Sequence, residues 1–249
     1  MSFKDHFSRL AAQYAAFRPA YPPELFGYLA QLCSERRVAW DCACGTGQAS
    51  VALADHFESV IATDASAQQV AAATPHDRVT YRVAKAEVSG FDAGSVDLVT
   101  VAQALHWFDL NAFYAEVERV LVPSGVIAVW TYGVLHVEGD AVDNLVQAFY
   151  HDIVGPYWPP ERRHVEEGYR ALAFPFASVP VPSFNMEARW ERAHLLGYVR
   201  SWSATGRYAE VNGVDPVAEL EQRLEPLWPD GQGARTITWP LGLRVGRGR

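Results

Sequence analysis

The chain has 249 residues, of which 49% are hydrophobic and 20% charged, values typical of a globular protein that buries a full core. Its formal net charge of −8 argues against nucleic-acid binding, because that affinity depends largely on a basic surface. Residues 1–6 carry no apolar signal segment, and no run approaches about 18 apolar residues, so we expect a cytoplasmic protein without membrane binding. The odd number of cysteines, Cys33, Cys42 and Cys44, speaks against a disulfide framework or a zinc site.

The first half of the chain alternates between strand-like and helix-like segments. Residues 2–36 are expected to be helical around a proline-rich joint, and Pro22 and Pro23 suit the first turn of a helix over 24–32. Apolar strand-like runs then follow at 38–42, 59–64, 79–85, 96–102 and 126–131. Helix-like stretches separate them at 48–57, 66–74 and 111–121, with a turn at 123–125. This alternation predicts parallel strands joined by right-handed crossovers, with the ligand at their carboxyl ends.

After residue 132 the alternation ends. Helical patterns recur at 140–154, 161–172, 191–204 and 215–227, and strand-like runs at 183–190 and 235–245. Tryptophan, tyrosine and proline are frequent in the helical parts, which is typical either of a lid over a substrate or of a second hydrophobic cluster.

A glycine turn directly follows the first predicted strand. Asp41 near the strand end leads through small residues to Gly45, Thr46 and Gly47, and a helix begins at once. Glycines there let the backbone approach a ligand, and the free N–H groups of a helix start point toward it. The second predicted strand ends in Asp64, 17 residues after Gly47 (64 − 47), where a carboxylate can accept hydrogen bonds from both ribose hydroxyls. Together these features predict an adenosine-containing ligand.

Missing features narrow the choice of ligand. The third glycine of a G-x-G-x-x-G dinucleotide fingerprint is replaced by Ser50, and the only two lysines, Lys4 and Lys85, do not belong to a phosphate-binding loop. The anionic side chain of Asp41, expected at the mouth of the loop, would repel phosphate and attract an ammonium group. S-adenosylmethionine carries an adenosine at one end and an amino acid at the other. It therefore offers a ribose to Asp64 and an ammonium group to Asp41.

Residues 41–47, Asp-Cys-Ala-Cys-Gly-Thr-Gly, resemble the D-x-G-x-G-x-G loop of class I S-adenosylmethionine-dependent methyltransferases, with Ala43 in place of the first glycine. Further similarity lies in Tyr-Ala-Ala-Phe-Arg-Pro-Ala-Tyr-Pro at 14–22, Ala-Lys-Ala-Glu at 84–87 and Gln-Ala-Leu-His-Trp-Phe at 103–108. Over residues 5–132 the chain resembles the type 11 methyltransferase group, which includes trans-aconitate methyltransferases.

The resemblance implies an α/β, Rossmann-like fold with a seven-stranded, mostly parallel sheet, an antiparallel last strand and helical lid insertions. We therefore expect a single methyltransferase domain over 1–249. Its expected parts are N-terminal cap helices at 1–36, a cofactor-binding core at 37–132, a substrate lid at about 133–180 and 191–230, and final strands at 183–190 and 235–245.

The resemblance also implies a set of contacts to S-adenosylmethionine and to its product S-adenosylhomocysteine. An acid such as Glu87 would lie beside the adenine, and Arg18 would pair with the methionyl carboxylate, although both also suit ordinary solvated positions. The full set of candidate cofactor-binding residues is Tyr14, Arg18, Asp41, Ala43, Cys44, Gly45, Thr46, Gly47, Asp64, Ala65, Gln68, Ala86, Glu87, Gln103, Ala104, His106 and Trp107.

His106 is the best-placed titratable residue, because it follows the fourth predicted strand. It is the candidate catalytic base, while packing against the cofactor is the alternative that the resemblance favours. Weak candidates for binding a substrate are Tyr157, Trp158, Arg162 and Arg207, since lid arginines can bind an acidic molecule and solvated helix faces explain them equally well. The other histidines lack the spacing of metal ligands, so we expect no metal.

The leading hypothesis is a methyltransferase that acts on a small molecule, with a carboxylic acid as candidate acceptor, and that works as a monomer or homodimer. A nicotinamide-dependent oxidoreductase shares the glycine turn and Asp64, but Asp41, Ser50 and the lack of a Tyr-x-x-x-Lys dyad weaken it. A non-catalytic S-adenosylmethionine-binding module is the third hypothesis, because a fold does not fix a function.

Overall fold

The computed structural model describes residues 19–248, so the candidate cofactor residues Tyr14 and Arg18 and the helices expected within 2–18 lie outside the described residues. Among the described residues, 21–133, 163–185 and 240–248 form one compact unit, here called the sheet unit. Residues 19–20, 134–162 and 186–239 form a second, the helical unit. Of the expected lid, 134–162 and 191–230 thus fall in the helical unit and 163–180 in the sheet unit. A single methyltransferase domain stays a prediction.

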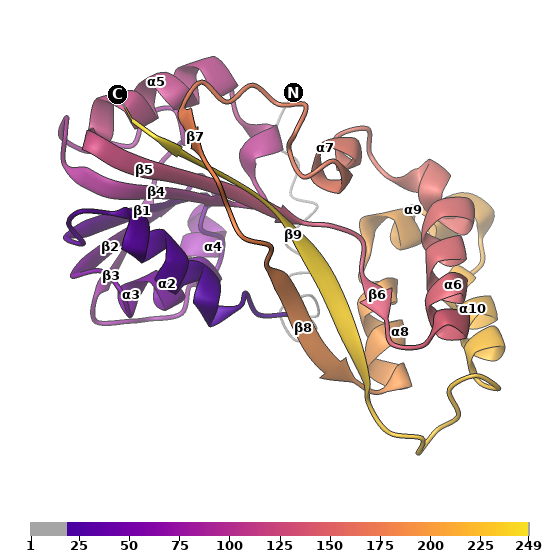
Figure 1. Ribbon diagram of the computed structural model, residues 1–249. Helices are drawn as coiled ribbons and strands as arrows, with labels where there is room; N and C mark the ends of the chain where they lie inside the picture. The colour runs from indigo at the N-terminus through magenta and orange to yellow at the C-terminus, as the bar shows by residue number, and fades with distance from the viewer. Residues whose placement is uncertain (1–18, 249) are drawn as a thin grey trace. The chain divides into compact units, whose positions relative to one another are not determined.

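The sheet unit is built on a mostly parallel sheet with the order β3-β2-β1-β4-β5-β9, drawn in Figure 1. Its parallel strands are β1 (Val38–Cys42), β2 (Ser59–Asp64), β3 (Val79–Val83), β4 (Val96–Ala102) and β5 (Leu121–Tyr132). β9 (Arg235–Arg247) is antiparallel to β5, as expected. The first six residues of β4 are buried, because helices cover both faces of a parallel sheet.

The expected count of seven strands is wrong, because the sheet formed by the described residues has nine. β6 (His136–Val137), β7 (Ala177–Val179) and β8 (Asn185–Trp190) all pair with β9. β8 is the strand predicted at 183–190, whereas β6 and β7 were not predicted. Strands of two or three residues are too short to show an alternating apolar pattern.

Two large aromatic residues show how the helices of the sheet unit cover the sheet. Trp130 of β5 contacts Phe26 of α2 (Pro23–Leu32), with ring centroids 6.2 Å apart. Trp40 of β1 contacts Phe113 of α5 (Leu110–Val120), also at 6.2 Å. The remaining short helices of this unit are α3 (Gln48–Ala54), α4 (Ala67–Ala71) and η1 (Leu105–Trp107), together with α7 (Arg162–Glu166), whose first residue belongs to the helical unit.

Two sequence predictions in this unit need correction. The turn predicted at 123–125 lies inside β5, where a bulge between the pairs Val96–Leu121 and Leu98–Val126 accommodates it and Ser124 has a φ of 62°. The helix predicted over 161–172 ends at Glu166, because Gly168 and Tyr169 both adopt the left-handed conformation with a φ of 60°.

The helical unit contains α6 (Asp140–Ala148), a π-turn η2 (Phe149–Ile153), η3 (Gly155–Tyr157), α8 (Arg192–Arg200), α9 (Ser203–Asn212) and α10 (Pro216–Leu224). The single helix predicted at 191–204 is in fact two helices that break at Ser201 and Trp202, and α9 was largely missed. Within residues 19–248 no helix is both long and apolar enough to cross a bilayer.

Candidate functional site

The loop after β1 adopts an unusual backbone that explains its glycines. Ala43, Gly45 and Gly47 have φ values of 57°, 56° and 87°, so every second residue is left-handed. A Cβ atom on Gly47 would collide with the hydroxyl of Tyr81, so another residue there would have to displace this side chain, and the φ of 87° itself favours glycine. Tyr81 is a residue that sequence reasoning missed; it reaches this position from β3, and its hydroxyl donates to the carbonyl of Thr74 at 2.8 Å.

Asp64 connects this loop to the turn that follows β2. Its carboxylate accepts the N–H of Gly45 at 2.9 Å and the N–H of Ser66 at 2.8 Å. The neighbouring N–H of Cys44 donates to the carbonyl of Thr63 at 3.0 Å. The side chain is half-buried at the carboxyl end of the strand, so the predicted acid and the predicted glycine loop meet in space. The candidates Ala65 and Gln68, which follow it, are both exposed.

Asp41 lies beneath the loop rather than at its mouth, where we expected it. Its carboxyl is 1% exposed and accepts hydrogen bonds from the hydroxyls of Ser50 at 2.5 Å and Thr100 at 3.0 Å. Burial raises the pKa of Asp41 to about 6, against the lowering effect of these two hydrogen bonds. Asp41 is buried and does not lie at the mouth of the loop because the strand register places it between Ala62 of β2 and Thr100 of β4. Ser50, noted in the sequence only as a missing glycine, is thus a hydrogen-bond partner of this acid.

The ends of β3 and β4 supply an acid and exposed apolar surface. Glu87 is half-buried and accepts the N–H of Asp109 at 3.2 Å, while the preceding Ala86 is buried. Val83 and Val88 are 56% and 70% exposed, and Trp107 is 50% exposed. Exposed tryptophan and valine side chains offer apolar surface where a ligand ring can lie.

Gln103 occupies a strained position just past the end of β4. Its φ of 61° is rare for a residue with a side chain, and its Oε1 accepts the hydroxyl of buried Thr131 at 2.9 Å. Its Nε2 is buried and has no hydrogen-bond partner within residues 19–248. A buried donor of this kind at a strand end is consistent with a site that a ligand completes.

His106 is half-buried in η1, and its Nδ1 lies 2.9 Å from the hydroxyl of Tyr169. Its ring also contacts that of Trp107, with centroids 4.6 Å apart. Tyr169 is fully buried, and sequence reasoning missed it because 63 residues separate it from His106.

The four substrate candidates lie in the helical unit, where they fall into two groups. The guanidinium carbon of Arg162 lies 4.7 Å from the centre of the Trp158 ring, and its Nε donates to the hydroxyl of Tyr150 at 2.8 Å. Arg207 is exposed and donates to the carbonyl of Tyr157 at 3.5 Å. Tyr150, Trp158, Tyr198 and Trp202 belong to one aromatic cluster, so part of this content is core.

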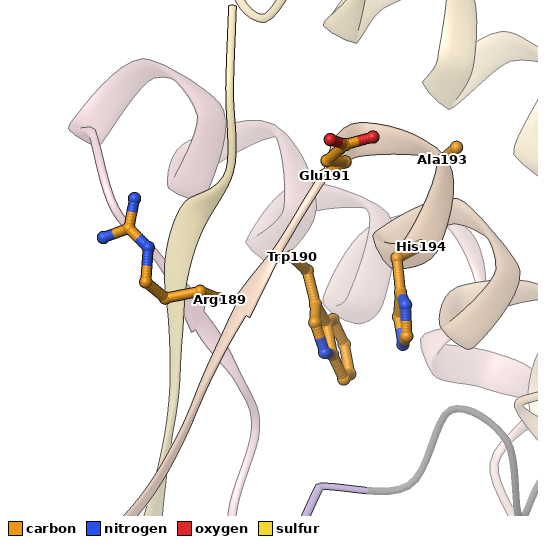
Figure 2. Close-up of a pocket in the computed structure, with 5 residues that line it drawn as sticks. All are labelled: Arg189, Trp190, Glu191, Ala193 and His194. Carbon is orange, nitrogen blue, oxygen red and sulfur yellow. The ribbon is translucent and has the colours of Figure 1, made fainter.

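Figure 2 shows an open hollow of the helical unit, lined by Arg189, Trp190, Glu191, Ala193 and His194. The rings of Trp190 and His194 stack with centroids 4.3 Å apart, and burial lowers the pKa of His194. None of the four substrate candidates lines this hollow. Over residues 19–248 there is also no cluster of three or more histidine, cysteine, aspartate or glutamate side chains suited to a metal ion.

Comparisons with known proteins give a consistent result. Residues 40–129 match a family model described as a methyltransferase domain. A putative methyltransferase of Dictyostelium discoideum is 33% identical over 225 residues, which cover 89% of this chain and 86% of the relative. A probable S-adenosylmethionine-dependent methyltransferase of Saccharomyces cerevisiae is 25% identical over 245 residues, covering 83% of each chain. The solved structure of a putative type II methyltransferase from Anaeromyxobacter dehalogenans is 44% identical, with a TM-score of 0.89 over 92% of this chain and 97% of that one.

Proposed function

The chain belongs to the class I S-adenosylmethionine-dependent methyltransferases, and we propose that it binds S-adenosylmethionine at the carboxyl ends of β1–β4 and methylates a small organic acid. The observation that carries the cofactor site is the joining of the left-handed loop to Asp64. A Cβ atom on Gly47 would meet the hydroxyl of Tyr81, and the carboxylate of Asp64 joins the loop to the turn that follows β2. These residues fit a nucleoside ligand: Asp64 would bind the ribose, and Trp107 and Val88 offer apolar surface to the adenine.

Bound S-adenosylmethionine would supply an electrophilic methyl group on a sulfonium. The task left to the protein is to align the acceptor atom with that methyl and to exclude water, which can account for much of the rate. A carboxylate acceptor is already ionised at pH 7 and needs no general base. The arginines of the helical unit support an acidic acceptor, since Arg207 is exposed beside Tyr157. The names of the three proteins compared above specify no acceptor.

Calorimetric titration with S-adenosylhomocysteine tests the cofactor site. We expect Asp64→Ala to weaken binding by on the order of 1–3 kcal/mol, because a ribose hydroxyl loses its acceptor. Asp64→Asn keeps one acceptor oxygen and should lose less. Asp55→Ala is the control, because Asp55 is an exposed acid that pairs with Arg78 at 3.8 Å on the surface. Wild-type affinity in Asp64→Ala, or tighter binding of NAD than of S-adenosylhomocysteine, would overturn the assignment.

A further inference from the structure

Glu116 of α5 connects this helix to the loop at residues 85–91 that follows β3, and it lies outside the set of candidate cofactor residues. Its Oε1 accepts the N–H of Ser89 at 2.9 Å and also the hydroxyl of Ser89, which itself accepts the N–H of Phe91 at 3.3 Å. Arg119 donates to both carboxylate oxygens, from Nε to Oε2 at 2.7 Å and from Nη2 to Oε1 at 2.8 Å. The carboxylate thus joins the loop to the helix.

Burial and charge make this connection strong. The side chain of Glu116 is 10% exposed, and Ser89 is 5% exposed. Hydrogen bonds from Arg119 and Ser89 lower the pKa of Glu116 to about 2, against the raising effect of burial. Glu116 is therefore ionised near neutral pH, and a hydrogen bond to a charged acceptor is stronger than one between neutral groups.

A second hydrogen bond joins the same loop to the start of α5. Oε1 of Glu87 accepts the N–H of Asp109, the N-cap residue of this helix, at 3.2 Å. Glu87 and Ser89 are thus both bonded to the α5 segment, whereas Val88 between them is 70% exposed. The N–H of Val88 donates to the carbonyl of Lys85 at 3.3 Å, which closes a turn. The bonds on either side therefore fix where this exposed valine lies.

We propose that Glu116 is a positioning residue of the cofactor site, which acts through Ser89 to hold the 85–91 loop so that Val88 presents its apolar side chain to the adenine base. This inference rests on the proposed binding of S-adenosylmethionine and deepens it. A surface that is already ordered in the free protein costs less conformational entropy on binding, so its contact with the base contributes more to affinity. Glu116 itself does not touch the ligand.

The first test is amide hydrogen exchange of the full chain without cofactor, followed by mass spectrometry. In Glu116→Ala we expect faster exchange over residues 85–91, because the N–H of Ser89 loses its acceptor. Glu116→Gln keeps an oxygen that can accept both bonds from Ser89 and should change less. The matched control is Glu118→Ala, at an exposed acid of the same helix. Exchange over 85–91 that is unchanged in Glu116→Ala, or equally faster in Glu118→Ala, would overturn the proposal.

The second test compares S-adenosylhomocysteine with S-ribosylhomocysteine, which lacks the adenine, by calorimetric titration and displacement. The ratio of the two affinities measures the contribution of the base. Glu116→Ala should lower this ratio by about 3- to 10-fold, as expected when a valine side chain loses its apolar contact. Val88→Ala should lower it by a similar factor. The double variant should lose little more than either single variant, because both substitutions act through one side chain.

Ser89→Ala removes only the hydroxyl and should lower the ratio less, and it serves as the test where Glu116→Ala does not fold. Equal losses of affinity for both ligands in the Glu116 and Ser89 variants, or fully additive losses in the double variant, would contradict the positioning role. A wild type that does not bind S-adenosylhomocysteine would remove the proposed function and this inference with it. Binding by the wild type with an unchanged ratio in the variants would remove the inference alone.

Discussion

The buried carboxyl of Asp41 should make folding stability depend on pH in an unusual direction. Its pKa is about 6 in the folded chain, raised by burial, and about 3.9 in an unfolded chain. Between these values the native state binds more protons, so this residue's contribution to stability is largest below about pH 4 and is lost as the pH rises through 6.

We therefore predict that Asp41→Asn removes this pH-dependent term. In urea unfolding at pH 4 and 7.5, the change in the free energy of unfolding between the two pH values should differ from that of the wild type by roughly 2–3 kcal/mol, with the variant relatively more stable at pH 7.5. Asp55→Asn, at an exposed acid, should follow the wild type. Parallel profiles for Asp41→Asn and wild type would show that the carboxyl is not shifted in this way.

Ala43 carries backbone strain that glycine would relieve. Its φ of 57° costs an L-residue about 1–2 kcal/mol, whereas the greater freedom of glycine in the unfolded chain costs about 0.4–1 kcal/mol. We predict that Ala43→Gly raises the free energy of unfolding by up to about 1 kcal/mol in urea titrations. Ala52→Gly, within α3, should instead lower it by about 1 kcal/mol. Equal losses in both variants would show that Ala43 is not strained.

At the scale of elements, the parts predicted well are those specified by nearby residues. The strands β1, β2 and β4 have the predicted bounds because each is a short apolar run between turn residues. The glycine loop and Asp64 were found together because the order of parallel strands places their ends at one edge. Long-range pairing determines the parts that were missed: β6 and β7 pair with β9, and Tyr169 reaches His106 across 63 residues. Such contacts leave no local pattern in the sequence.

The close approach of Gly168 and Gly242 gives a prediction at this scale. A methyl group on Gly242 would lie 2.5 Å from the Gly168 Cα atom, so the loop that carries Tyr169 has to move away from β9. We predict that Gly242→Ala lowers the free energy of unfolding by about 1–3 kcal/mol, the usual cost of overpacking. Gly206→Ala in α9 is the matched control, because nothing among the described residues lies within 4 Å of the place where its Cβ atom would be. Alanine also favours a helix, so stability should rise there by about 1 kcal/mol. If Gly242→Ala were as stable as the wild type, the Gly168 loop and β9 would be far enough apart to accept a methyl group.

At the scale of the whole molecule, the two ligands of the proposed reaction draw their candidate contacts from different compact units. The described cofactor candidates belong to the sheet unit, and Tyr157, Trp158, Arg162 and Arg207 to the helical unit. Substitutions in the helical unit should therefore change the acceptor's KM and leave S-adenosylhomocysteine affinity unchanged. Arg207 is the better probe of the two arginines, because Arg162 packs on Trp158 and its loss would also disturb the aromatic cluster.

We predict that turnover of an organic acid varies little between pH 6 and 8, because a carboxylate with an ordinary pKa is ionised throughout this range. Arg207→Glu should raise the KM of that acid by roughly 10-fold or more, as expected when an attractive charge becomes repulsive, with kcat nearly unchanged. Arg223→Glu reverses another exposed charge of the helical unit and should have little effect. A steep rise of turnover with pH that His106→Ala abolishes would instead show a base-assisted hydroxyl, amine or carbon acceptor. That result would remove the carboxylate and leave the enzyme a methyltransferase.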